Sequence, residues 1–126
     1  MDKLRLRPEH YVGAASEHFA AYYFMDLGHQ VYWPAVAQSA VDFLIEDDSG
    51  IYKVQVKTAT MNRADGREYL QCRTRLTNGG QDLHPKDLYD YLVVVYQGEL
   101  LVIPSGVIES SNISLRADKW DDYKAL

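Results

Sequence analysis

One short apolar segment limits the architecture more than any other part of the chain. From Tyr91 to Tyr96 every side chain is aliphatic or aromatic, at odd and even positions alike. Successive side chains of a strand point to opposite faces, so a strand of this composition has to be covered on both sides. We therefore expect residues 91–96 to form a central strand of a sheet that carries packed elements on each face.

The remaining pattern places one long helix before a series of strands. Apolar spacing predicts a helix over residues 8–27, with Pro8 suited to its first turn and Gly28 to a left-handed stop. Strands are predicted at 29–33, 41–46, 51–58, 68–74, 91–96 and 99–103, with a hairpin turn at 47–50, a polar loop at 60–67 and short helical turns near 85–89 and 118–123. This order predicts an α/β fold, bordering on α+β, in which helices flank a mixed sheet.

Length and composition exclude several classes of protein. The chain has 126 residues without an internal repeat or linker, so we expect one domain spanning residues 1–126. A lone cysteine, Cys72, excludes a scaffold held by internal disulfides. Neither a signal peptide nor an apolar run of about 18 residues is present, and we expect a soluble cytoplasmic protein with no membrane partner.

Basic side chains are concentrated in one part of an otherwise acidic chain. The net charge is −5, which argues against a protein that coats nucleic acid without specificity. Residues 53–75 nevertheless hold six basic and two acidic side chains. We expect phosphate contacts from the arginines of this segment, while an ordinary solvated surface is the alternative; the arginines are Arg63, Arg67, Arg73 and Arg75.

Three polar residues interrupt the apolar strands. Asp42 stands between Val41 and Phe43, and a carboxylate is rarely buried without a partner or a metal. Gln55 and Lys57 are two residues apart, so their side chains project from the same face of the next strand. If the two strands form a hairpin about Ser49 and Gly50, Asp42 lies opposite residues around 57. A carboxylate, an amide and an ammonium would then meet at one edge of the sheet.

Glu17 is the candidate fourth member of this cluster. It lies among small and apolar residues of the predicted helix, which indicates that it faces another element rather than water. Oxygen ligands from Glu17, Asp42 and Gln55 suit Mg²⁺, and Lys57 could orient or deprotonate an attacking water. Taken singly, the same residues also fit a turn cap, a salt bridge or a solvated strand face.

The order of these residues resembles the PD-(D/E)XK nuclease superfamily. Residues 13–17 (Gly-Ala-Ala-Ser-Glu) are similar to the opening of the archaeal Holliday-junction resolvase branch, and residues 54–58 (Val-Gln-Val-Lys-Thr) to the branch that contains an intron-encoded homing endonuclease. The resemblance implies a restriction-endonuclease-like core and cleavage of DNA that depends on Mg²⁺, or on Mn²⁺ in its place. It also implies roles for four residues: Asp42 as central metal ligand, Gln55 in the place of the usual acidic ligand, Lys57 as catalytic lysine and Glu17 as the helix glutamate.

The chain departs from that pattern at two positions. Ala40 and Val41, rather than a proline, precede Asp42, and Gln55 replaces a carboxylate by a neutral amide. The second departure leaves open a module that binds nucleic acid or assembles with a partner without cutting, and an RNA-directed nuclease is a further alternative. Because one chain holds one site, cutting both strands of DNA implies a homodimer or higher homo-oligomer, for which Val107, Ile108 and Trp120 are candidate interface residues.

Overall fold

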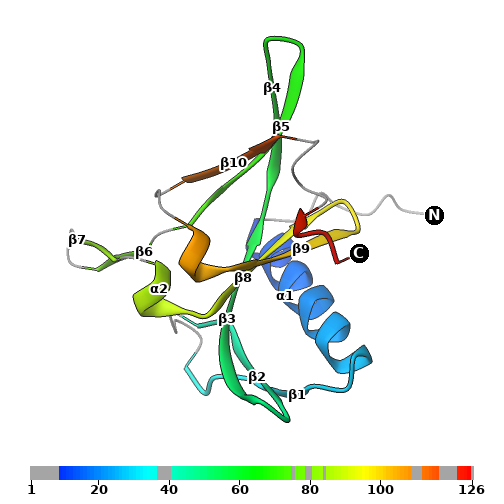
Figure 1. The fold of residues 1–126 in the computed structure, drawn as a ribbon, viewed down its shortest axis with the longest axis vertical. Helices are drawn as coiled ribbons and strands as arrows, with labels where there is room; N and C mark the ends of the chain where they lie inside the picture. The colour runs from blue at the N-terminus through cyan, green and yellow to red at the C-terminus, as the bar shows by residue number, and fades with distance from the viewer. Residues whose placement is uncertain are drawn as a thin grey trace, which may run out of the picture.

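The computed structural model describes residues 9–36, 41–74, 76–78, 81–83, 85–108, 112–116 and 122–125. Its centre is a five-stranded sheet in the order β1-β2-β3-β8-β9 (Figure 1). Only the pairing of β3 with β8 is parallel, so the sheet is mixed as predicted. The strands are β1 Gln30–Tyr32, β2 Phe43–Asp47, β3 Gly50–Thr58, β8 Tyr91–Tyr96 and β9 Glu99–Pro104.

Strand β8 has neighbours on both sides and packing on both faces, which confirms the prediction made from its composition. Val93 and Val95 belong to one buried cluster, whereas Leu92 and Val94 belong to another. The two clusters lie on opposite faces because side chains alternate along the strand. The sheet is therefore the middle layer of the molecule.

Helix α1, Glu9–Asp26, covers the first face of the sheet and packs against β3. Ala20 and Ala21 are fully buried, and their small side chains let the helix backbone approach the strands closely. Phe24 extends this contact to Phe43 on β2, with ring centroids 6.1 Å apart. The helix ends as predicted, since Gly28 adopts a φ of 94°.

The second face is covered by short elements from the middle and the end of the chain. Helix α2, Pro85–Leu88, and the 3₁₀ helix η1, Ser105–Val107, lie against each other. Tyr89 and Ile108 follow these two elements and are buried in the second cluster. Ile108 is only 3% exposed, so its place in an interface between chains, expected from the sequence, is wrong. Trp120 lies outside the described residues.

A hairpin projects from this body and corrects the prediction of a loop over residues 60–67. Strands β4, Thr60–Ala64, and β5, Arg67–Arg73, pair in antiparallel fashion, and we call this hairpin the arm (Figure 1). Asp65 and Gly66 form its turn with φ values of 54° and 73°, as a two-residue hairpin turn requires. Strand β10, Asn112–Arg116, pairs with β5 and was not predicted.

The other described segments are small. Strands β6, Leu76–Asn78, and β7, Gln81–Leu83, form a separate two-stranded pair. The helical turn predicted near 118–123 lies mostly outside the described residues. Among the helices that the structure describes, none has the length and apolar character needed to cross a membrane.

Candidate metal and catalytic site

The candidate site forms where β2 and β3 stop pairing. Their hairpin register runs from Asp47 opposite Gly50 to Phe43 opposite Val54. One residue further, the Asp42 N–H still donates to the Val54 carbonyl at 2.9 Å, but Asp42 precedes β2 and does not lie within it as predicted. The next N–H of β3 on this side, that of Val56, donates to Asp42 Oδ2 at 2.6 Å. The carboxylate thus takes the place of a strand carbonyl at the point where the two strands separate.

The register corrects the sequence prediction by two residues. Asp42 lies beside Gln55 and Val56, not opposite residues around 57, because the turn is centred between Asp48 and Ser49. The Asp47 carboxylate fixes that turn by accepting hydrogen bonds from Ser49 N–H at 2.8 Å and Gly50 N–H at 3.2 Å. Hydrogen bonds from an aspartate side chain to the backbone of its own turn help to fix the residues on which the turn is centred.

Gln55 is held in one orientation by its neighbour. Its Nε2 donates to Asp42 Oδ2 at 3.0 Å, and the residue is only 6% exposed. Because an ionised carboxylate can only accept hydrogen bonds, the amide must turn its NH₂ group toward Asp42 and its oxygen away. That oxygen, Oε1, is buried, and no described residue donates a hydrogen bond to it. A buried acceptor without a donor is costly, unless it serves as a ligand.

Glu17 reaches Asp42 and Gln55 from α1, and we call the place where these three side chains meet the corner. Burial, then a hydrogen bond with the Asp42 carboxyl, then repulsion from the Asp42 charge together raise the pKa of Glu17 to about 7. Two carboxyl groups this close are stable when a proton or a cation lies between them. Glu17, Asp42 and Gln55 are therefore brought together from a helix, a strand end and a neighbouring strand.

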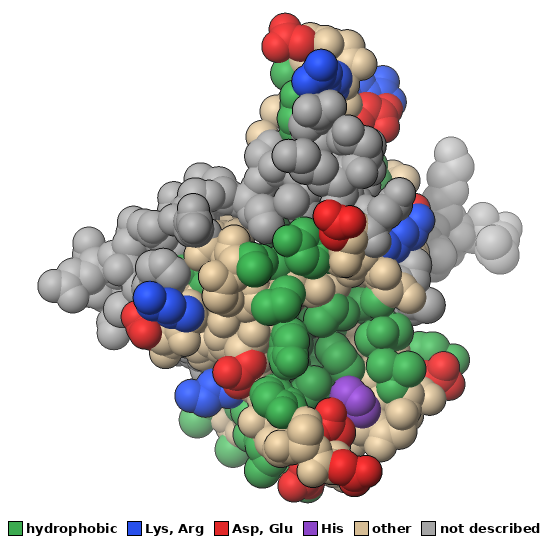
Figure 2. All heavy atoms as spheres, in the orientation of Figure 1, with side chains coloured by type: hydrophobic (Ala, Val, Ile, Leu, Met, Phe, Trp, Pro, Cys, Tyr) green, Lys and Arg blue, Asp and Glu red, His purple; other side chains and the backbone are tan. Residues whose placement is uncertain are grey.

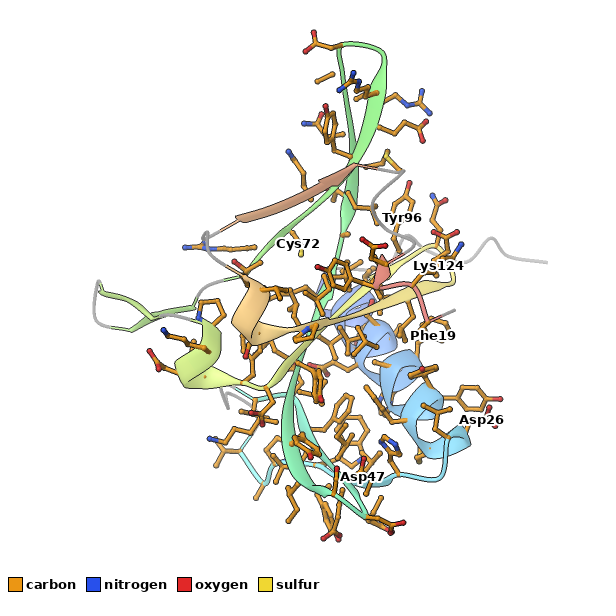
Figure 3. The ribbon with its side chains drawn as sticks, viewed as in Figure 1. Phe19, Asp26, Asp47, Cys72, Tyr96 and Lys124 are labelled. Carbon is orange, nitrogen blue, oxygen red and sulfur yellow. The ribbon has the colours of Figure 1, made fainter. Side chains whose placement is uncertain are left out.

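Lys57 lies on the same strand face as Gln55 but stands apart from this contact. The structure gives it no hydrogen bond or ion pair with Glu17, Asp42 or Gln55. Its charge instead acts on Cys72 of β5, where it partly opposes the burial that raises the pKa of that thiol to about 12. Beside Cys72, which is labelled in Figure 3, lies a hollow of about 420 Å³ at the base of the arm; Thr60, Gln71 and Arg73 also line it.

The donor set fits a hard divalent cation. No group of three or more His, Cys, Asp or Glu side chains with metal-site geometry occurs in the described part of the chain. The corner instead combines two carboxyl groups with the unpartnered amide oxygen of Gln55. Few oxygen ligands, with water in the remaining positions, are what Mg²⁺ prefers. Glu17, Asp42 and Gln55 therefore fit such an ion.

A contact that the sequence did not reveal holds α1 in place beside the corner. Ser16 Oγ lies 2.6 Å from Thr58 Oγ1, and Ser16 is buried. The bond ties the residue before Glu17 to the residue after Lys57. Ser16 belongs to residues 13–17, which resemble the opening of a nuclease branch. A single sequence, however, does not show that Ser16 would form a hydrogen bond with Thr58.

The predicted arginines are distributed along the arm. Arg63 and Arg67 lie near its tip and are exposed, and Arg63 forms an ion pair with Glu68 at 3.2 Å. Arg73 is exposed at the end of β5 closest to Lys57 and Cys72. Arg75 lies outside the described residues. The structure thus spreads these side chains from the base of the arm to its tip and does not gather them into one cluster.

Comparisons with known proteins give a family from the sequence and a fold from the structure. A family model described as PD-(D/E)XK endonuclease matches residues 8–124. Protein 5.3 of Escherichia phage T7 is 35% identical over 97 residues, which cover 77% of this chain and 80% of the phage protein. The bacterial homing endonuclease I-Ssp6803I has a similar structure, with a TM-score of 0.66 at 22% identity over 89% of this chain and 85% of that one. The restriction-endonuclease-like fold predicted from the sequence is confirmed.

Proposed function

Because this chain belongs to the PD-(D/E)XK endonuclease family, we propose that it hydrolyses phosphodiester bonds of DNA at the corner formed by Glu17, Asp42 and Gln55. The observation that carries this proposal is the buried Gln55 Oε1, which receives no hydrogen bond from any residue that the structure describes and lies beside two adjoining carboxyl groups. We assign the three side chains as ligands of Mg²⁺, for which Mn²⁺ can substitute. When bound, the ion neutralises charge that develops on the phosphate and makes a nearby water more acidic.

Each residue of the corner contributes something different. Asp42 is fixed by the Val56 N–H and by the Gln55 amide, so its carboxylate needs little reorganisation to act as a ligand. Gln55 would offer its buried amide oxygen as a ligand. Burial and the neighbouring Asp42 raise the pKa of Glu17 to about 7, and a cation held here would favour the ionised form of Glu17.

Lys57 acts beside the ligands and not among them. None of the described residues forms an ion pair with it, so its ammonium is available to the scissile phosphate or to the attacking water. A lysine in this position supplies either a hydrogen bond to the phosphate or a site for proton transfer. Its strand face continues toward the hollow at the base of the arm, where Arg73 offers a further phosphate contact.

DNA approaches from the side of the arm in this proposal. Arg63, Arg67 and Arg73 are exposed along it and would contact phosphates next to the scissile position, together with Arg75. Such contacts position the duplex without specifying its sequence. One chain provides one corner, so cutting both strands requires two copies of the chain.

Cleavage of supercoiled plasmid and branched DNA tests the proposal. We expect cleavage that requires Mg²⁺ or Mn²⁺ and that falls by about 100-fold or more in Asp42→Asn, because the central ligand loses its charge. Asp48→Asn is the matched control, since Asp48 is exposed in the β2–β3 turn and should leave the rate unchanged. A wild-type protein that binds DNA without cutting would favour the non-catalytic alternative, and equal rates for Asp42→Asn and wild type would remove the assigned site.

A further inference from the structure

A small aromatic hollow lies next to the corner, on the side away from the arm. It has a volume of about 180 Å³, and the side chains of Tyr32 and Trp33 line it. Both are large aromatic residues that remain partly open to solvent, with 44% and 47% of their surface exposed. Val41 and Phe43, which flank Asp42 in the chain, also line the hollow, as do Pro34 and Leu44. The segment that carries the central candidate ligand therefore forms one wall of the hollow.

The ring of Trp33 is held between the two chain segments that supply the carboxyl groups. Its centroid lies 5.2 Å from the ring of His18 and 5.3 Å from the ring of Phe43. His18 directly follows Glu17, and Phe43 directly follows Asp42. The exposed part of the Trp33 ring is thus a fixed surface beside the corner.

Tyr32 is fixed as well, and the hollow between these rings is narrow. The Tyr32 hydroxyl donates a hydrogen bond to Glu46 Oε1 at 2.7 Å. Rings that are ordered before binding lose little conformational freedom when a ligand packs on them. The volume of about 180 Å³ is smaller than the roughly 300–1,000 Å³ of most small-molecule sites. The hollow therefore suits one flat ring better than a larger ligand.

The charge around the hollow indicates which part of DNA could enter it. No Lys or Arg occurs between residues 8 and 52, the segment that contains α1, β1 and β2. These elements lie at the opposite end of the molecule from the tip of the arm (Figure 1). Figure 2 shows basic side chains on the arm, whereas the side chains in view over the end of α1 are hydrophobic, acidic or histidine. Phosphates are held by basic side chains, so the part of DNA that reaches the hollow has to be uncharged, as the bases are.

We propose that the hollow holds one unpaired nucleobase next to the scissile phosphate, with Trp33 as the ring on which the base stacks. This inference rests on the proposed function, because the corner defines where the scissile phosphate lies. Stacking on an aromatic side chain tolerates every base, since each has a π-face. A base within a duplex must first leave its stack, which costs free energy. The site therefore favours DNA with an unpaired base near the cut, whichever base that is.

Tryptophan fluorescence tests this proposal without any cleavage. Trp120→Phe leaves Trp33 as the only tryptophan of the chain. Without a divalent metal, this protein is titrated with a paired duplex, the same duplex with a one-nucleotide bulge, and the bulged duplex with an abasic site in place of the extra base. We expect the bulged duplex to quench Trp33 and to bind about tenfold more tightly than the other two. Equal affinity and equal fluorescence with all three DNAs would overturn the proposal.

Substitution of Trp33 tests the same preference in the full chain. Trp33→Ala should bind the bulged and paired duplexes equally, whereas Trp33→Phe should keep most of the preference because a flat ring remains. Val107→Ala is the control, since Val107 is 54% exposed on η1, which covers the other face of the sheet, and should keep the full preference. Circular dichroism checks that each variant is folded, and the comparison with the abasic DNA needs no change at Trp33. A folded Trp33→Ala variant that keeps the preference contradicts the assignment.

Failure of this proposal and failure of the proposed function give different results. Quenching by the bulged duplex without cleavage in Mg²⁺ would support the base site and remove the nuclease assignment. Cleavage that depends on Asp42, without quenching and without a preference for the bulge, would support the nuclease assignment and remove the base site.

Discussion

Strand β3, which carries Gln55 of the corner, continues into the arm through the single residue Ala59, but the corner and the arm are built in opposite ways. At the corner, β3 lies in the middle of the sheet, and Gln55 is buried with its amide fixed by Asp42. In the arm, most side chains of β4 and of the first half of β5 are exposed. Precise placement of a few polar atoms needs the packed sheet, whereas contact with a long charged partner needs only reach and exposed charge.

This contrast predicts that substitutions in the two regions affect different quantities. Changes at the corner should alter the rate and the dependence on metal while leaving DNA affinity almost unchanged. Changes in the arm should alter DNA affinity and its dependence on salt while leaving the metal requirement unchanged. Four predictions follow the size of the expected effect, from the loss of a catalytic group to the loss of one phosphate contact.

The largest effect is expected for Lys57→Ala. Removing the ammonium takes away a hydrogen bond or a proton-transfer site at the scissile phosphate, and the rate should fall by about 100-fold or more. Single-turnover cleavage of a saturating DNA substrate measures this rate, with Lys53→Ala as control, because Lys53 is an exposed lysine of the same strand, four residues before Lys57. A loss of affinity with an unchanged rate would mean that Lys57 belongs functionally to the arm.

A smaller effect in the opposite direction is expected for Gln55→Glu. A third carboxylate beside Glu17 and Asp42 adds attraction for a cation, so half-maximal cleavage should need about tenfold less Mg²⁺. Repulsion among the three carboxylates should lower the melting temperature of the metal-free variant. Adding Mg²⁺ should then raise the melting temperature of the variant by more than that of the wild type. If neither the Mg²⁺ requirement nor the metal-dependent melting shift changes, Gln55 is not a ligand.

The pH dependence of stability should reveal the raised pKa of Glu17. Without a divalent metal, the pKa of Glu17 is about 7 in the folded chain, whereas the unfolded chain releases this proton near the ordinary glutamate pKa of 4.5. Between these values the folded state binds more protons, so the free energy of unfolding decreases as pH rises. The melting temperature should fall by on the order of a few degrees across this interval. Glu17→Gln should flatten the slope, and an equal slope in both proteins would contradict the assignment.

The smallest effect is expected for single arginines of the arm. Arg67→Ala should weaken DNA binding about two- to fivefold and reduce the slope of log K against log salt by about 1. Arg63→Ala should have less effect, because Glu68 already forms an ion pair with Arg63 at 3.2 Å. Fluorescence anisotropy over a range of salt concentrations measures both. A salt slope that neither variant changes would remove the arm from the DNA interface.

The sequence predicted the sheet better than it predicted the arm, for a physical reason. Residues 92–95, Phe43 and Ile45 are buried in the core, so their apolar side chains report their position directly. Strand β4 is mostly exposed and polar, and its pairing with β5 is set by the whole hairpin. The pair Asp65-Gly66 is typical of a hairpin turn, but the polar residues before it are equally compatible with a loop.

Three of the four residues predicted to meet at the corner lie together, whereas Lys57 stands apart, and the predicted register was two residues off. The positions of Asp42, Gln55 and Glu17 in the sequence were enough to expect them close together, and the structure brings their side chains into contact. The two-residue difference in register depends on the Asp47 carboxylate and its bonds to the turn, which spacing alone does not show. The roles of the four residues, including Lys57, remain predictions that the experiments above address.

The joint at Ala59 also constrains how such a molecule can diverge. Its N–H donates to the Val95 carbonyl at 2.9 Å, which anchors the place where the sheet continues into the arm. Because neighbouring side chains alternate, inserting one residue here would present the opposite side of the arm, whereas inserting two would restore the original one. We therefore expect related chains to differ in the length of the arm by even numbers of residues at this joint, while strand β3 before it keeps its length.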